Sequence, residues 1–158
     1  MPMKHELLFL GKTKEPFLAD GIDEYAARLG HYTAVGIEIL KEKRKPGQDE
    51  AALVATEGAQ ILAAVRPGAL VVALDGGGQA LSSLELAALL SRWEERGVKL
   101  VNYLLGGHLG LADSVLLRAD FCLSLSKLTF THGMARLILL EQLYRAYTIK
   151  AGEKYHKG

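Results

Sequence analysis

The sequence predicts an α/β fold in which a mostly parallel, five-stranded sheet carries helices on both faces. Short apolar runs alternate along the chain with longer segments whose apolar residues follow helical spacing. Two of the runs, residues 69–74 and 100–105, are apolar almost throughout, as expected of strands that are buried on both faces. Because no repeat, low-complexity segment or linker divides the 158 residues, we expect one domain over residues 1–158.

Each element of the first half ends at residues that disfavour its continuation. A short apolar strand closes at Gly11, and a helix that opens at Pro16 ends before Gly30. A second strand leads into a charged loop at residues 41–48, and the following helix stops before Pro67. In chain order, these expected elements are residues 6–10, 16–29, 35–40 and 50–65.

The second half continues the alternation through glycine-rich turns. Residues 75–78 (Asp-Gly-Gly-Gly) interrupt the third apolar run, and Ser82 with Glu85 forms a capping box at the start of the next helix. Gly106 and Gly107 follow the fourth strand. In chain order, the expected elements are residues 69–74, 83–96, 100–105, 111–118, 121–125 and 133–147.

Charge is distributed unevenly, although the net charge is only +1. Residues 127–158 hold six basic and two acidic side chains, and residues 41–45 (Lys-Glu-Lys-Arg-Lys) form a second basic cluster. Both segments suit contacts with nucleic-acid phosphates, and the alternative is that they are ordinary solvated surface residues. A single cysteine and no apolar run of bilayer-spanning length indicate a cytoplasmic protein that contacts no membrane.

Ligands of open parallel sheets bind beyond the carboxyl ends of the strands. Three such ends, at Leu74, at Gly106 and at residues 125–130, are therefore the candidate binding loops. None of them contains a dinucleotide fingerprint or a phosphate-binding P-loop, which disfavours a nucleotide-cofactor oxidoreductase. The five histidines lack the close spacing of metal ligands, so we expect no metal. Cys122 lies within an apolar strand, and we interpret it as a small buried side chain.

Several motifs resemble one family and occur in its order. The segments are Leu74-Asp75, the glycines at 106, 107 and 110, residues 123–130 (Leu-Ser-Leu-Ser-Lys-Leu-Thr-Phe), His132, residues 141–146 (Glu-Gln-Leu-Tyr-Arg-Ala) and residues 155–157 (Tyr-His-Lys). Together they resemble the ribosomal RNA large subunit methyltransferase H family, the smallest of the knotted SPOUT methyltransferases. Thr131 departs from the pattern, because the family usually has proline there, and we expect a looser loop at this point.

The resemblance implies an enzyme that methylates N3 of a pseudouridine in 23S rRNA on the assembled ribosome. It also implies a C-terminal trefoil knot, S-adenosylmethionine as the cofactor, and a homodimer in which the partner's C-terminal part completes each site. Carried over by residue, the cofactor contacts are Leu74, Gly106, Leu125, Ser126, Lys127, Leu128, Thr129 and Phe130.

The same resemblance assigns catalytic roles near the C-terminus. His156 is the candidate base for the N3 proton, Tyr155 would stack on or bond the target base, and Arg145 would hold phosphate or developing negative charge. The alternative for Arg145 is a surface ion pair with Glu141, one helical turn away. The expected RNA contacts are Lys157, Lys154, Arg136 and His132, and the alternative for His132 is a helix cap or a packing role.

Two other functions stay open from the sequence. One is a knotted methyltransferase for a different RNA such as tRNA, which the absence of a separate RNA-binding domain disfavours. The other is a ribosome-binding module without catalysis, which would have basic patches but no cofactor pocket.

Overall fold

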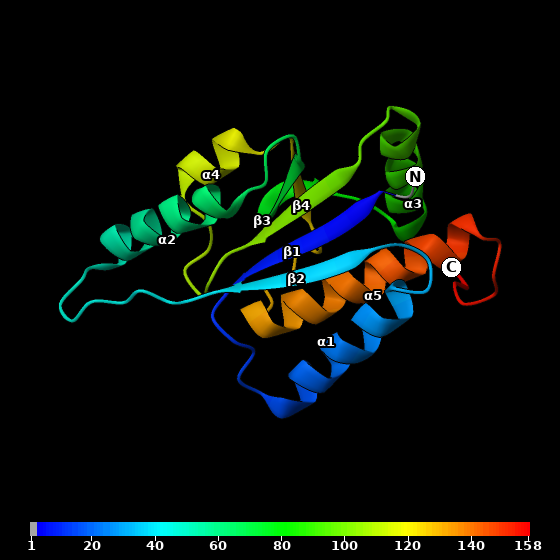
Figure 1. Ribbon diagram of the computed structural model, residues 1–158. Coiled ribbons are helices and arrows are strands. Elements are labelled where there is room, and N and C mark those ends of the chain that lie inside the picture. Colours follow the sequence, from blue (N-terminus) through cyan, green and yellow to red (C-terminus); the bar gives the residue numbers. More distant parts are fainter. Residues whose placement is uncertain (1–2) are drawn as a thin grey trace.

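The computed structural model describes residues 3–158 and contains five strands and five helices that alternate along the chain (Figure 1). In order, the elements are β1 (Lys4–Leu10), α1 (Pro16–Leu29), β2 (Val35–Leu40), α2 (Glu50–Ala64), β3 (Leu70–Ala80), α3 (Ser83–Glu95), β4 (Leu100–Leu105), α4 (Asp113–Arg118), β5 (Phe121–Ser124) and α5 (His132–Lys150). The expected alternation is thereby confirmed. Among residues 3–158, no helix combines the length and apolar character that crossing a membrane requires.

The strands form one sheet in the order β2-β1-β4-β3-β5, and every pair of neighbours is parallel. In the register of the sheet, Leu7 of β1 lies between Ile37 of β2 and Tyr103 of β4. Because all five strands run the same way, their carboxyl ends meet at one edge of the sheet. This order agrees with a threaded C-terminal crossover, and the knot itself stays a prediction.

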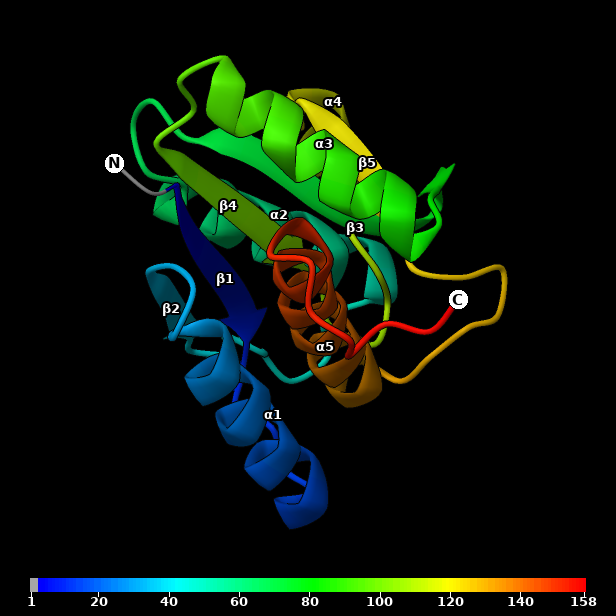
Figure 2. The same cartoon turned by 90° about the vertical axis from the view of Figure 1, so that its right-hand side faces the viewer.

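Helices cover both faces of the sheet, as predicted (Figures 1 and 2). Helices α1, α3 and α5 enclose the larger core, to which β1 contributes Leu7 and Phe9. Helices α2 and α4 enclose a smaller core on the opposite face, where Leu8 and Leu10 of the same strand are buried. Side chains alternate between the faces of a strand, so burial on both faces explains why residues 7–10 are all apolar.

Strand β3 differs from the prediction, because it continues past residue 74 to Ala80. The pairing with β5 shifts across a bulge, so that both Leu74 and Gln79 lie opposite Leu123. Gly78 makes this close pairing possible, since a Cβ there would lie 2.6 Å from the carbonyl oxygen of Cys122. The glycine run therefore bends the strand instead of ending it.

Helix α5 begins one residue earlier than expected and extends three residues further, to Lys150. Thr148 is fully buried there, and its hydroxyl donates to the carbonyl of Arg145. Lys150 forms an ion pair with Glu94 of α3. These tertiary contacts stabilise the last turn of the helix, which the apolar pattern of the sequence did not predict. At the other end, Thr131 caps the helix by accepting the amide of Met134 at 3.3 Å, which gives this residue a defined role where proline was expected.

Candidate functional site

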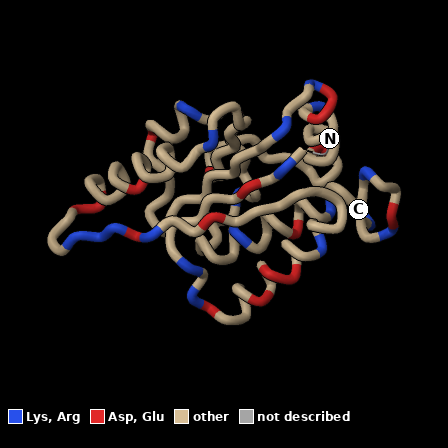
Figure 3. The backbone as a smooth tube through the Cα atoms, viewed as in Figure 1, with Lys and Arg blue, Asp and Glu red and all other residues tan. Residues whose placement is uncertain are grey.

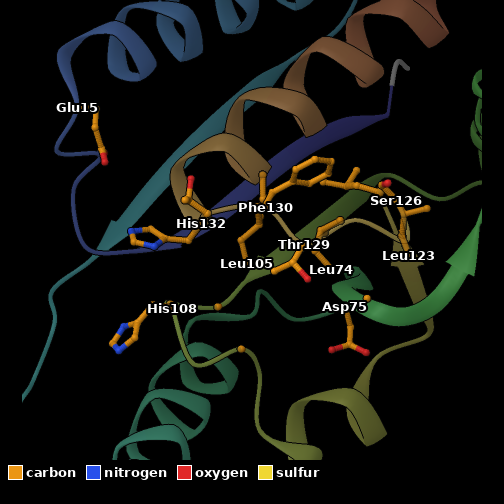
Figure 4. A pocket seen from close by; sticks show the side chains of 17 residues that line it. Glu15, Leu74, Asp75, Leu105, His108, Leu123, Ser126, Thr129, Phe130 and His132 are labelled. Atoms are coloured by element: carbon orange, nitrogen blue, oxygen red, sulfur yellow. The ribbon is translucent and has the colours of Figure 1, made fainter.

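A pocket of about 530 Å³ opens at the carboxyl edge of the sheet (Figure 4). It lies beside the bend of β3 at residues 74–76 and the ends of β4 and β5, and its size is within the range of small-molecule sites. Its lining comprises Glu15, Leu74, Asp75, Gly76, Leu105, Gly106, Gly107, His108, Gly110, Leu123, Leu125, Ser126, Thr129, Phe130, Thr131, His132 and Ala135. The three candidate loops predicted from the sequence therefore meet around one cavity.

The loop that follows β4 contributes main chain to the wall of the pocket. A Cβ on Gly106 would lie 2.7 Å from the carbonyl oxygen of Gly110, so only glycine fits this turn. Gly110 has a φ of +84° and bonds through its amide to the carbonyl of Gly107. Because these residues lack side chains, their amide and carbonyl groups can approach a ligand closely.

A buried carboxylate from α2 supports this loop from behind. The Glu57 side chain lies 3.5 Å from the position that a Cβ on Gly107 would take. Glu57 is only 6% exposed, and burial raises the pKa of its carboxyl group above the usual value. No sequence motif distinguished this residue, since a glutamate within a helix is ordinarily solvated.

The loop between β5 and α5 forms the opposite wall. Ser126 turns the chain, because its hydroxyl accepts the amide of Leu128 at 3.0 Å while its carbonyl accepts the hydroxyl of Ser124 at 2.9 Å. This turn directs the next two side chains outward: Lys127 is exposed, Leu128 is 75% exposed, and neither lines the pocket. The prediction that Lys127 and Leu128 contact the cofactor stays a prediction, and their outward side chains leave the main chain of the loop as the part that faces the pocket.

The structure brings the other predicted cofactor residues together. They are Leu74, Gly106, Leu125, Ser126, Thr129 and Phe130. Leucine and phenylalanine side chains supply an apolar wall, and the glycine loop supplies polar main-chain groups. This combination suits a ligand with a flat aromatic part and several hydrogen-bonding groups.

Three polar side chains, Glu15, His108 and His132, lie at one side of the pocket (Figure 4). Burial, followed by the nearby Arg136, lowers the pKa of His132, so its ring is neutral at pH 7. His108 accepts a bond at Nδ1 from Arg44 at 3.0 Å. The sequence singled out only His132 from this group, and it contained no signal for Glu15.

The three predicted catalytic residues form a second cluster near the other end of α5. Arg145 donates to Glu141 at 2.7 Å and to Nδ1 of His156 at 3.2 Å. Its guanidinium also lies over the ring of Tyr155, 4.7 Å from the centroid, and the Tyr155 hydroxyl donates to Glu141 at 2.8 Å. The ion pair between Arg145 and Glu141 exists as the alternative proposed, and it is one part of this larger cluster.

The electrostatics of the cluster favour the protonated forms of Arg145 and Tyr155. Hydrogen bonding to Glu141 raises the pKa of Arg145, which stays charged. Burial raises the pKa of Tyr155, and the neighbouring Tyr25 and Glu141 add to the effect, so the phenol stays protonated. The guanidinium is consequently the one positive centre that lies against both the phenol and the imidazole.

The pocket and the cluster are separated within one chain. His132 lines the pocket as the first residue of α5, and Arg145 lies thirteen residues later in the same helix. At 1.5 Å per residue, the two positions are about 20 Å apart along the helix axis. The catalytic candidates of a chain therefore do not reach the pocket of the same chain.

Arg136 corrects the predicted RNA contacts. Its side chain is fully buried, donates to the carbonyl of Leu10 at 2.7 Å and to the hydroxyl of Thr13 at 3.0 Å, and stacks on Phe9. Burial lowers its pKa to about 10, which still leaves it charged at neutral pH. The residue joins α5 to the end of β1 and is inaccessible to RNA, whereas Lys154 and Lys157 are exposed on the C-terminal tail.

Comparisons with known proteins agree with this geometry. A family model described as predicted SPOUT methyltransferase matches residues 3–156. The chain is 57% identical to ribosomal RNA large subunit methyltransferase H of Desulfotalea psychrophila and 43% identical to that of Bifidobacterium adolescentis, in each case over 98% of this chain and all of the relative. A probable methyltransferase from Bordetella pertussis shares the fold, with a TM-score of 0.55 and 15% identity over 92% of this chain and 96% of that one.

Proposed function

Because the chain belongs to the SPOUT methyltransferases, and within them to the ribosomal RNA large subunit methyltransferase H family, we propose that it methylates N3 of a pseudouridine in 23S rRNA. The methyl donor is S-adenosylmethionine, the substrate is the assembled ribosome, and the reaction takes place in the cytoplasm. The observation that carries the proposal is the convergence of the bend of β3 and the loops after β4 and β5 on one pocket.

The residues of the pocket fit the proposed cofactor. Leu74, Leu125 and Phe130 provide apolar surface for an adenine ring, and the main chain around Gly106 provides donors and acceptors for its polar edge and the ribose. The cavity of about 530 Å³ has room for a ligand of this size. When bound, the cofactor supplies a methyl group on a positively charged sulfur, which makes the carbon electrophilic.

The C-terminal cluster supplies the groups that act on the target base. Arg145 places positive charge where the carbonyl oxygens of the base gain negative charge as N3 loses its proton. The ring of Tyr155 offers a platform on which a splayed-out base can stack. In the observed geometry, Nδ1 of His156 accepts from Arg145, so the neutral ring presents Nε2–H as a donor. His156 can serve as the base only after Arg145 releases Nδ1 to the substrate proton.

A homodimer resolves the separation between the pocket and the cluster. In the proposed assembly, the α5 end and the tail of one protomer close over the pocket of its partner, which brings Arg145, Tyr155 and His156 to the bound cofactor. Lys154 and Lys157 then lie beside the pocket opening and contact RNA phosphates, and His132 approaches the RNA from the pocket rim. The support for this assembly is the distance of about 20 Å within one helix.

The pocket favours this function over a ribosome-binding module without catalysis, which needs no such cavity. The test is methyl transfer from labelled S-adenosylmethionine to intact ribosomes and, separately, to tRNA, with the modified nucleotide identified by mass spectrometry. We expect one methyl group on a pseudouridine of 23S rRNA and none on tRNA. Label in tRNA alone would contradict the proposed substrate, and no transfer to either would contradict the enzymatic role.

A further inference from the structure

The loop between β2 and α2 carries an unpaired group of cations. Within residues 41–45, the four basic side chains of Lys41, Lys43, Arg44 and Lys45 are exposed, and the loop extends from the body of the protein (Figures 1 and 3). In the described part of the chain, none of the ion pairs involves these four residues. We call residues 41–48 the basic arm.

The one acidic side chain of the basic arm does not neutralise these cations. Glu42 turns back toward the body of the protein and packs its carboxylate against Gly11. It therefore contributes its charge to the base of the arm, near Arg136 and His132. The outer part of the arm presents positive charge to solvent.

Helix α2 holds the basic arm at both ends. Gln60 donates to the carbonyl of Lys41 at 2.6 Å, and Gln48 donates to the hydroxyl of Thr56 at 3.1 Å. A turn closed by the amide of Gln48 and the carbonyl of Lys45 reverses the chain between these anchors. Because these bonds restrain both ends of the arm, an anion that binds it orders less of the chain, which lowers the entropic cost of binding.

The basic arm also reaches the pocket. Strand β2 is parallel to β1 and β4, so the arm leaves the sheet at the same edge at which the pocket opens. From there the guanidinium of Arg44 extends to His108, which lines the pocket, with Nη2 3.0 Å from Nδ1. The cations are therefore continuous with the rim of the pocket and not a separate patch.

We propose that the basic arm binds phosphates of the RNA strand that flanks the target nucleotide. This inference rests on the proposed function. When the target base of an RNA approaches the bound cofactor, the phosphates on either side of that base lie beside His108. Arg44 is suited to bidentate contact with one phosphate, and the lysines provide point charges for its neighbours. The RNA would then contact both chains: the basic arm of the chain that supplies the pocket, and the C-terminal tail of its partner.

The test compares two variants that lose the same charge. One carries Lys43→Ala, Arg44→Ala and Lys45→Ala in the arm. The control carries Arg92→Ala, Arg96→Ala and Lys99→Ala, three exposed cations at the opposite edge of the sheet, where α3 leads into β4. Binding to a stem-loop fragment of 23S rRNA is measured by fluorescence anisotropy at several salt concentrations, together with KM for ribosomes and calorimetric affinity for S-adenosylmethionine.

We expect the arm variant to reduce the slope of log affinity against log salt by about 2 to 3, because each lost phosphate contact removes about 0.7 to 0.9. Its KM for ribosomes should rise about tenfold or more, while cofactor affinity stays at the wild-type value and the control variant behaves like wild type. An arm variant with the wild-type salt slope, or a control that loses as much, would overturn the proposal. If the wild-type protein binds the stem-loop through the arm yet methylates no ribosome, the proposed function fails and the arm assignment stands.

Discussion

Mixed dimers test whether each site is built from two chains. Gly106→Ala disables the pocket, because the new Cβ would lie 2.7 Å from the backbone oxygen of Gly110. His156→Ala disables the cluster at the far end of α5. If the pocket of one chain works with the cluster of its partner, a dimer with one chain of each kind contains one intact site of two and has about half of the wild-type activity.

For the complementary mixed dimer we expect no activity. A dimer of one wild-type chain and one chain with both substitutions contains no intact site in the shared arrangement, whereas it keeps one if each chain uses its own cluster. Two different affinity tags allow each mixed dimer to be purified, and methyl transfer to ribosomes is then measured against the homodimers. Activity in the complementary mixture but not in the first, or a protein that stays monomeric, would refute the two-chain site and the separation of about 20 Å on which it rests.

Three more predictions concern particular residues. His156→Ala should slow single-turnover methyl transfer about 100-fold while cofactor affinity is unchanged, and a near-normal rate would exclude a role in proton transfer. Burial, and secondly the charge of Lys150, lowers the pKa of His5 from 6.5 to about 3. Between these pH values the unfolded state binds a proton at this histidine and the folded state does not. The free energy of unfolding should therefore fall by about 1.4 kcal/mol for each pH unit from 6.5 down toward 3. In urea titrations, His5→Gln should lack this component and the exposed His31→Gln should retain it; equal pH dependence in all three proteins would contradict the assignment. Arg136→Met should lower the free energy of unfolding by about 2 to 3 kcal/mol, since the carbonyl of Leu10 loses a charged donor, while the salt dependence of RNA binding stays at the wild-type value; the reverse result would restore the RNA contact.

Local signals explain why much of the fold was predictable. The limits of α1, β2 and β4 agree with the sequence-based ranges. Pro16 and Gly30 mark the ends of the helix, and each strand is a short, mainly apolar run, so these signals lie within the elements themselves. The extension of β3 to Ala80 was not predictable, since it depends on a bulge opposite β5. The same holds for the end of α5, which Glu94 of another helix stabilises.

The candidate site was predictable where topology alone decides position. Parallel strands bring their carboxyl ends to one edge, and this places Gly106 and Leu125 together without knowledge of the packing. Leu74 joins them at the bend of β3, where the sequence predicted the end of that strand. Glu15 reaches the pocket only because Gly133 lets the segment before α1 pack closely against α5, where a Cβ would lie 2.9 Å from Leu18. Such contacts between distant segments leave no periodic pattern in the sequence.

Arg136 shows the opposite error. Charge counting treats an arginine as a surface residue. The helical spacing of Leu139, Leu140 and Leu143 nevertheless places position 136 on the buried face of α5, and this signal was not used. Its burial depends on a backbone carbonyl at the end of β1 and on the ring of Phe9, both more than 120 residues earlier in the chain. A basic residue can therefore be assigned to an RNA surface only after its exposure is known.

Calorimetric titration with S-adenosylmethionine measures whether the pocket binds the methyl donor. We expect one binding site per chain in the wild-type protein and no detectable binding in Gly106→Ala, with both proteins folded by circular dichroism. Absence of binding to the wild-type chain, or equal binding to the variant, would contradict the assignment of the cavity between β3, β4 and β5 to the methyl donor.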